Sequence, residues 1–156
     1  MEAKVTWQGG MKLDGTADSG HIVPLSAKVS EGGDGSGFTP MELIATGMAG
    51  CTALDIISIL QKKRQDVTAF EVQVHAPREK EHPKVFTRAL LEYFITGRGV
   101  DEEAVVRSIE LSATRYCPAQ AMFSKVFPIE WRYHIFEAGE DGDRRLVKSG
   151  EYRYSP

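Results

Sequence analysis

The stretch of sequence that decides the fold is residues 39–63, TPMELIATGMAGCTALDIISILQKK. Thr39 can cap a helix, Pro40 suits the first helical position, and Glu42 completes a capping box with Thr39. The stretch ends in lysines, which suit the negative end of the helix macrodipole. We therefore predict one long helix that starts at Thr39-Pro40 and runs to about Lys63.

Apolar residues lie on most sides of this helix, and a helix that is apolar nearly all round is usually buried. Gly47 and Gly50 would let other elements approach it closely. Asp55 interrupts the apolar run, whereas a membrane span needs ~20 predominantly apolar residues with few or no charges. We therefore predict a core helix. One small sheet cannot readily cover it, so we also predict an obligate homodimer.

The residues before the helix predict strands. Residues 4–8 alternate polar and apolar side chains, as a half-buried strand does, and Gly9-Gly10 marks a turn. Asp14-Gly15 and Ser19-Gly20 are further turn candidates. Residues 21–29 offer another strand, with a proline that favours an edge position. The first part of the chain is thus expected to be β-structure.

The residues after the helix predict a hairpin. Residues 70–75 alternate cleanly, residues 76–83 form a charged connection, and residues 85–96 form a long strand. The two strands are therefore expected to pair through a long, polar tip.

A second helix is predicted from Asp101, because acidic residues fill its first turn. Tyr116-Cys117-Pro118 interrupts it, since a residue before proline is driven away from helical angles. A short helix restarts at Pro118, and residues 128–136 form the last strand of the main fold. The polar tail after it either adds an edge strand through Arg145 to Val147 or is disordered. These elements give an α+β class with mostly antiparallel strands.

Composition limits the class of protein. The 156 residues suffice for a single domain, 1–156, in which 137–156 are a polar C-terminal extension. The net charge is −3, so no basic field favours nucleic acid or an anionic membrane. No export signal opens the chain, and we expect a cytoplasmic protein.

Two cysteines, Cys51 and Cys117, are the residues with reactive potential. No CxxC occurs and no His lies three or four positions from either cysteine, so no zinc site is expected. Cys51 can be read as a small apolar core residue. Cys117 precedes proline at a helix cap, where backbone N–H groups and Arg115 favour a thiolate, or it merely fills the kink.

A glycine-rich segment, EGGDGSG at residues 31–37, precedes the long helix. It has neither the closing Gly-Lys-Ser/Thr of a P-loop nor the GxGxxG spacing of a dinucleotide site. We interpret it as a flexible loop.

Two motifs, in this order, resemble the OsmC/Ohr family of osmotically inducible and organic hydroperoxide resistance proteins. Residues 39–45, leading to Ala49-Gly50-Cys51, resemble the family's first cysteine helix. Tyr116-Cys117-Pro118 resembles the second family cysteine, which is also followed by proline. The interval between them, a strand pair and a helix, fits as well. The resemblance covers roughly residues 1–136.

The resemblance implies an OsmC-like fold, in which an intertwined homodimer has its active site at the subunit interface. Cys51 would be the peroxidatic thiolate that attacks an organic hydroperoxide and becomes a sulfenic acid. Cys117 would condense with it to a disulfide, and a dithiol reductant, of lipoyl type in the organic-hydroperoxide branch, would restore the pair. No metal or organic cofactor is implied.

The catalytic arginine and glutamate of the family match less well. The family's glutamate directly follows the proline, where this chain has Met41, and Glu42 lies one position, or ~100°, further round the helix. Glu42 is the candidate acid, although its capping role is a sufficient explanation and the preferred one. No arginine precedes Arg64, and the N-terminal strands offer Lys12, His21 and Lys28, which lack the planar guanidinium fork.

Three functions therefore remain open. The first is a thiol-dependent peroxidase acting on organic hydroperoxides through Cys51, Cys117 and Glu42. The second is a non-catalytic relative that binds a small apolar ligand at the dimer interface, which the missing arginine favours. The third is a structural protein with two inert core cysteines, which the recurrence of both motifs disfavours.

Overall fold

Helix α1 (Pro40–Lys62) is the longest element of the structure, a computed structural model that describes residues 1–153. Its start is the predicted capping box: the Glu42 carboxylate accepts hydrogen bonds from the Thr39 N–H (2.7 Å) and Thr39 hydroxyl (2.8 Å). The Thr39 hydroxyl in turn accepts the Glu42 N–H at 3.3 Å. The reciprocal pair satisfies donors that a helix start leaves free.

The burial of α1 differs from the expectation of a helix covered on most sides. Its fully buried residues recur every four positions and form one stripe: Met48, Thr52, Ile56 and Leu60. Leu54, on another face, is 72% exposed. By length and mean hydropathy (1.8), α1 also resembles a membrane span, but a single such helix is weak evidence because core helices share these properties.

The chain divides into two compact units, Met1–Thr46 and Gly47–Pro156. The first contains an antiparallel sheet in the order β1 (Ala3–Gly9), β2 (Lys12–Ala17) and β3 (Ile22–Ser26). The turns at Gly9-Gly10 and at Gly20 are confirmed by left-handed backbone angles at these glycines.

The turn expected at Asp14-Gly15 is wrong, because both residues lie inside β2. Gly15 pairs with Val5 on one side and with Val23 on the other. A Cβ there would lie 3.0 Å from the Val23 side chain and 3.1 Å from that of Leu25. The glycine thus permits close packing within a strand. In the sequence alone, the Asp-Gly pair is typical of a turn.

The loop before α1 is organised by one carboxylate, that of Asp34, after a short 3-10 helix, η1 (Val29–Glu31). Asp34 pairs with the Lys12 ammonium and accepts hydrogen bonds from Ser26 Oγ and from the N–H and Oγ of Ser36. These partners hold the pKa of Asp34 well below its usual range, the Lys12 hydrogen bond most strongly. The glycine-rich segment is therefore a structured loop.

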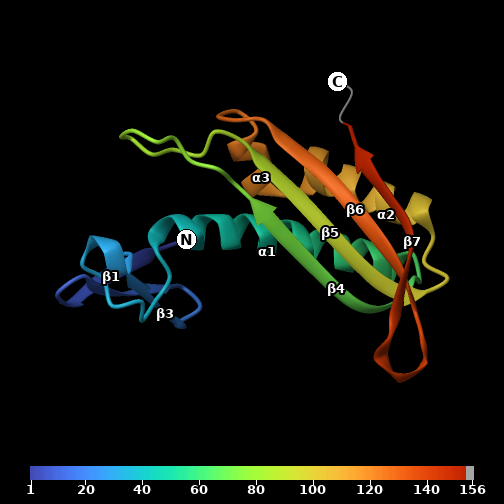
Figure 1. Ribbon diagram of the computed structural model, residues 1–156, viewed down its shortest axis with the longest axis horizontal. Coiled ribbons are helices and arrows are strands. Elements are labelled where there is room, and N and C mark those ends of the chain that lie inside the picture. The colour runs from blue at the N-terminus through green and yellow to red at the C-terminus, as the bar shows by residue number, and fades with distance from the viewer. Residues whose placement is uncertain (154–156) are drawn as a thin grey trace. The chain divides into compact units, whose positions relative to one another are not determined.

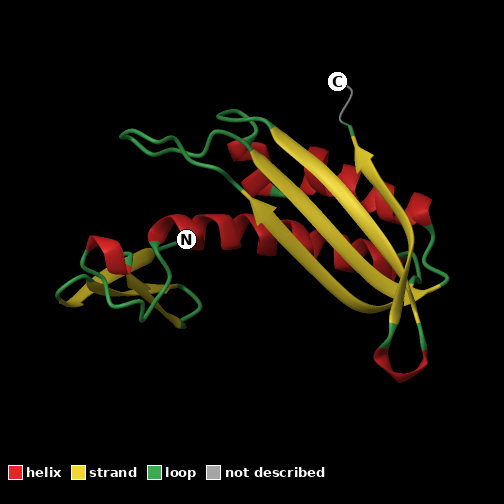
Figure 2. Ribbon diagram, viewed as in Figure 1, coloured by secondary structure: helices red, strands yellow, loops and turns green. Residues whose placement is uncertain are grey.

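The second unit contains a four-stranded sheet in the order β4-β5-β6-β7 (Figures 1 and 2). Its strands are β4 (Asp66–His75), β5 (Ala89–Arg98), β6 (Ile129–Ala138) and β7 (Arg144–Tyr152). The pairs β4–β5 and β6–β7 are antiparallel, and β5–β6 is parallel. Between β5 and β6 come α2 (Glu102–Leu111), a π-helical turn at Ser112–Tyr116 and α3 (Pro118–Phe123).

The helices of this unit cover one face of the sheet (Figure 2). Leu91, Tyr93 and Ile95 of β5 and Tyr133 and Ile135 of β6 point toward this face and are buried. The core of the unit therefore lies between the helices and the sheet, as an α+β protein requires.

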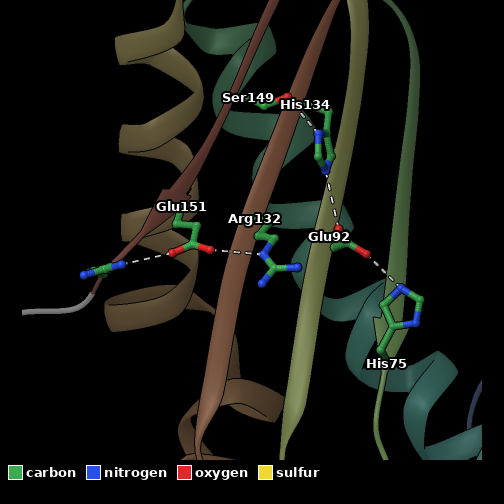
Figure 3. Close-up of polar contacts among 7 residues, drawn as sticks. His75, Glu92, Arg132, His134, Ser149 and Glu151 are labelled. Atoms are coloured by element: carbon green, nitrogen blue, oxygen red, sulfur yellow. Dashed lines mark hydrogen bonds and ion pairs between the residues drawn. The ribbon is translucent and has the colours of Figure 1, made fainter. Parts of the chain in front are cut away.

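The other face of the sheet carries a set of paired polar side chains (Figure 3). Glu92 lies between two histidines, His75 at 2.9 Å and His134 at 3.4 Å. Arg132 pairs with Glu151 across β6 and β7 at 3.2 Å. The face that the helices cover is therefore the one that can hold a site shielded from solvent.

The tail expected as either a short edge strand or a disordered segment forms β7, which is longer than the predicted Arg145–Val147. A short 3-10 turn, η3 (Glu140–Gly142), connects it to β6. Lys148 of β7 pairs with Glu102 of α2 at 3.4 Å and links the strand to the helical layer. Residues 154–156 of the predicted extension lie outside the described residues.

Candidate functional site

Cys51 and Cys117 lie next to each other, although they are far apart in the sequence. Cys51 belongs to α1 and Cys117 directly precedes α3, and the two thiols are within hydrogen-bonding contact. Both are free thiols; Cys117 is buried and Cys51 is partly exposed. The side chains of the two cysteines therefore lie close together, as expected.

Cys117 is placed by the break that Pro118 enforces. The π-helical turn ends at Tyr116, Cys117 takes an extended backbone (φ −79°, ψ 104°), and Pro118 begins α3. The N–H of Cys117 donates to the Ser112 carbonyl at 3.0 Å. Its sulfur accepts the backbone N–H of Gln120 at 3.5 Å, as the side chain of an N-cap residue does. The predicted interruption and restart of the helix are both confirmed.

The thiol of Cys117 is a poor acid, which corrects the helix-cap expectation. Burial, and to a smaller extent its hydrogen bond with Cys51, raise its pKa to about 12, although the Gln120 N–H acts in the opposite direction. A thiolate loses its hydration in an apolar site, and a single N–H from a helix of six residues does not compensate for that loss. Arg115, expected to add charge, lies against the Tyr116 ring at 5.5 Å.

A buried network of polar side chains surrounds the cysteine pair, and the sequence did not reveal it. Thr52 of α1 contacts the Tyr93 hydroxyl at 3.0 Å and the Ser112 hydroxyl at 2.9 Å. Ser112 donates to the Asp55 carboxylate at 3.0 Å and accepts from the Gln120 amide at 3.3 Å. Trp131 of β6 completes it by donating to Gln120 Oε1 at 2.6 Å.

Most members of this network are shielded from solvent. Thr52, Tyr93 and Ser112 are 0% exposed and Gln120 is 1% exposed. Burial is also the main cause that raises the pKa of Tyr93. Buried polar groups persist when every one of them has a partner, as they do here. The signal in the sequence was the pair of polar residues, Thr52 and Asp55, in the largely apolar middle of the helix.

The remaining predicted site residues lie in the first unit. Glu42 is engaged in the capping box, and the hydrogen bonds from Thr39 lower its pKa. Lys12, one substitute for the family arginine, is paired with Asp34. The roles of Glu42 and of these cations in a reaction stay predictions.

Metal binding finds no support in residues 1–153, where no three His, Cys, Asp or Glu side chains are grouped to hold an ion. On the outer face, His75 and His134 contact the Glu92 carboxylate at 2.9 Å and 3.4 Å. The chemistry available at the helical face is that of the two thiols.

The fold and the site define an α+β protein with two free thiols beside one face of a sheet. One thiol lies on the long helix α1, and the other lies at the helix interruption before Pro118. The family model described as OsmC-like protein matches residues 33–132, and the chain belongs to this family. Both the expected family and the expected α+β, OsmC-like fold are thereby confirmed.

Known proteins of the same kind match most of the chain. Protein YhfA of Escherichia coli strain K12 is 37% identical over 138 residues, which are 88% of this chain and all of that protein. A structural-genomics structure is 34% identical with a TM-score of 0.79 and covers 88% of this chain and all of its own. An organic hydroperoxide resistance protein from Legionella pneumophila shares the fold, with a TM-score of 0.64 and 17% identity. The match covers 86% of this chain and 94% of that protein's chain.

Proposed function

We propose that this chain is a thiol-dependent peroxidase that reduces organic hydroperoxides through a cycle of its two cysteines. The observation that carries the proposal is the contact between two free thiols in unequal environments, Cys51 partly exposed and Cys117 buried. The name of the Legionella protein, which has the same fold, supports the substrate class.

In the proposed cycle the Cys51 thiolate attacks the terminal oxygen of the hydroperoxide. The O–O bond breaks, the sulfur is oxidised to a sulfenic acid, and the alcohol leaves with a proton from solvent. The Cys117 thiol then attacks the Cys51 sulfur. A disulfide forms, and the sulfenic hydroxyl leaves with the thiol proton as water. A small dithiol, of lipoyl type, returns both cysteines to thiols.

The assignment of Cys51 as the attacking residue rests on access and acidity. Cys117 is 2% exposed and its pKa is raised to about 12, so it carries almost no thiolate at neutral pH. Cys117 therefore acts in the second step, where its nearness to the sulfenic acid at Cys51 favours the reaction and its proton leaves with the sulfenic hydroxyl. Glu42 keeps its proposed place as the acid of the site.

We also propose that the working form is a homodimer in the cytoplasm. One face of α1 carries Gly47, Gly50 and Leu54 at helical spacing, and all three are exposed. A Cβ placed on Gly47 or Gly50 would meet nothing within 4 Å. A helix face with small residues beside an exposed leucine fits the close approach of a second copy, and Cys51 adjoins this face.

The test is consumption of cumene hydroperoxide and of hydrogen peroxide, with dihydrolipoamide as the reductant. Wild type should consume the organic peroxide faster, and Cys51→Ser should lose the activity while its thermal unfolding stays close to wild type. Ser124→Ala, an exposed change in the turn after α3, serves as a control that keeps full activity. Equal rates for wild type and Cys51→Ser would refute the proposal.

A second candidate is a non-catalytic relative that binds a small apolar ligand, with the ligand site at the dimer interface. Glu42 and Lys12 are each engaged within the first unit, and no arginine precedes Arg64. That unit also has an apolar groove of about 540 Å³ lined by Val5, Ile22, Leu25 and Leu43 among others, a volume that suits a small molecule. Saturable binding of an apolar fluorescent probe without peroxide consumption would favour this candidate.

A further inference from the structure

The hydrogen bonds beside the cysteine pair run in one direction, toward Asp55. A carboxylate only accepts, so the Ser112 hydroxyl, 3.0 Å away, uses its single proton for Asp55. Ser112 must then accept from Thr52 at 2.9 Å, and Thr52 must accept from the Tyr93 hydroxyl at 3.0 Å. One partly exposed carboxylate therefore determines the orientation of three buried hydroxyl groups.

The same network holds Cys117 from two sides. The Gln120 side chain is fixed at both ends, by Ser112 at 3.3 Å and by the Trp131 indole at 2.6 Å. The backbone N–H of Gln120 points to the Cys117 sulfur, and the Ser112 carbonyl accepts the Cys117 N–H. Two of the residues that bond to Cys117 through their backbones, Ser112 and Gln120, are thus members of the network that ends at Asp55.

We propose that Asp55 is a positioning residue: through Ser112 and Gln120 it holds Cys117 in place beside Cys51. Its negative charge adds a smaller effect to the burial that is the main reason Cys117 stays a thiol. The description of Cys117 as the second thiol rests on the proposed function. The orientation of the hydrogen-bond network and the charge of Asp55 do not depend on the proposed function.

The titratable groups near Cys117 act against its ionisation, and the Gln120 N–H acts in the opposite direction. Cys51 and Asp55 approach it from α1, and Tyr93, whose own pKa responds to Cys117, approaches from β5. All three are neutral or negative, and the Asp55 charge disfavours a thiolate. Early ionisation of Cys117 would add a second negative charge beside the sulfur that has to attack peroxide.

The experiment uses the Cys51→Ser protein, in which Cys117 is the single cysteine. The ¹³Cβ chemical shift of labelled cysteine, followed against pH, reports the thiolate directly and does not depend on reagent access. Asp55→Asn keeps the size and an acceptor for Ser112 but removes the charge. We expect its titration to move to lower pH, and Asp55→Glu to return it toward the parent curve.

A second measurement tests the positioning role. Ser112→Ala keeps the Asp55 charge but cuts the network, so the amide hydrogens of Cys117 and Gln120 should exchange about tenfold faster. The amide of Val105, buried in α2, should exchange as before. This variant also tests the proposal if Asp55→Asn fails to fold.

An unchanged titration in Asp55→Asn would overturn the charge role, and unchanged exchange in Ser112→Ala would overturn the positioning role. Neither measurement contains peroxide. A failed peroxidase assay therefore leaves both results interpretable, and their failure leaves the peroxidase proposal standing.

Discussion

The thiol of Cys51 contacts the thiol of Cys117, and the two differ in their access to water: Cys117 is 2% exposed, whereas Cys51 is partly exposed. A contact of this kind favours disulfide formation, because the second thiol is already in place when the first is oxidised. We therefore expect one equivalent of cumene hydroperoxide to give an intramolecular disulfide. Non-reducing mass spectrometry should show the loss of two hydrogens and a linked pair of cysteine peptides. Two free thiols after this treatment would exclude a redox pair.

The order of oxidation can be tested by trapping. In Cys117→Ser, the sulfenic acid at Cys51 has no second thiol to react with and should accumulate, so dimedone should label Cys51. With excess peroxide it should go on to the sulfinic acid. Cys51→Ser should show little label, because the buried Cys117 thiol is a poor acid. Label at Cys117 in Cys51→Ser, with none at Cys51 in Cys117→Ser, would reverse the assignment.

Much of the fold follows from local rules that act within a few residues. The capping box at Thr39, the break at Tyr116-Cys117-Pro118 and the strands on both sides of α1 were predictable, since each depends on neighbouring side chains. The burial of α1 was not, because its composition is apolar on most sides while a single chain buries one stripe of it. Gly15 was mistaken for a turn because the requirement for glycine arises from the neighbouring strand.

The candidate site was predictable only in part. Both cysteines belong to motifs, but the network around them joins residues from α1, β5, the π-helical turn, α3 and β6. Gln120 in a short helix has the appearance of a solvated residue, and only its place against Trp131 shows that it is buried. The low acidity of Cys117 likewise depends on tertiary burial, which overrides the local effect of the helix cap.

The Gln120 amide should contribute to stability, because it satisfies two other buried groups. In Gln120→Leu, the Trp131 indole N–H loses its acceptor and Ser112 loses a donor. A buried group left without its partner costs ~1–3 kcal/mol, so we expect a loss of this size in the free energy of unfolding. Chemical denaturation gives the value. Gln73→Leu, which removes an exposed amide bonded to Glu71 at 2.7 Å, should change stability by less than about 0.5 kcal/mol.

The homodimer prediction rests on the exposed face of α1. Replacing Leu54, which is 72% exposed, by arginine should place a charge in the proposed interface and give a 17.3 kDa monomer in sedimentation. Leu146→Arg alters a leucine of β7 that is 52% exposed and should leave the assembly as it is. A wild type that sediments at 17.3 kDa at micromolar concentration, or a Leu54→Arg protein that still sediments as a dimer, would contradict this interface.

The raised pKa of Cys117 also predicts how stability depends on pH. An unperturbed thiol has a pKa of about 8.5, and in the folded chain Cys117 has a pKa of about 12. Between these values the folded state keeps a proton that the unfolded state has released, so the contribution of this group is complete below pH ~8.5 and is lost as the pH rises toward 12. Burial also raises the pKa of Tyr93 and Tyr133 and acts in the same direction, so a comparison with Cys117→Ser is needed to isolate the thiol.

We expect the free energy of unfolding of wild type to fall more steeply than that of Cys117→Ser from pH 8.5 upward, and the two to run parallel between pH 6 and 8. Urea denaturation under reducing conditions, in steps of half a pH unit, measures both curves. Parallel curves above pH 8.5 would mean that Cys117 ionises as an ordinary thiol, and would remove the acidity argument for Cys51 as the attacking residue.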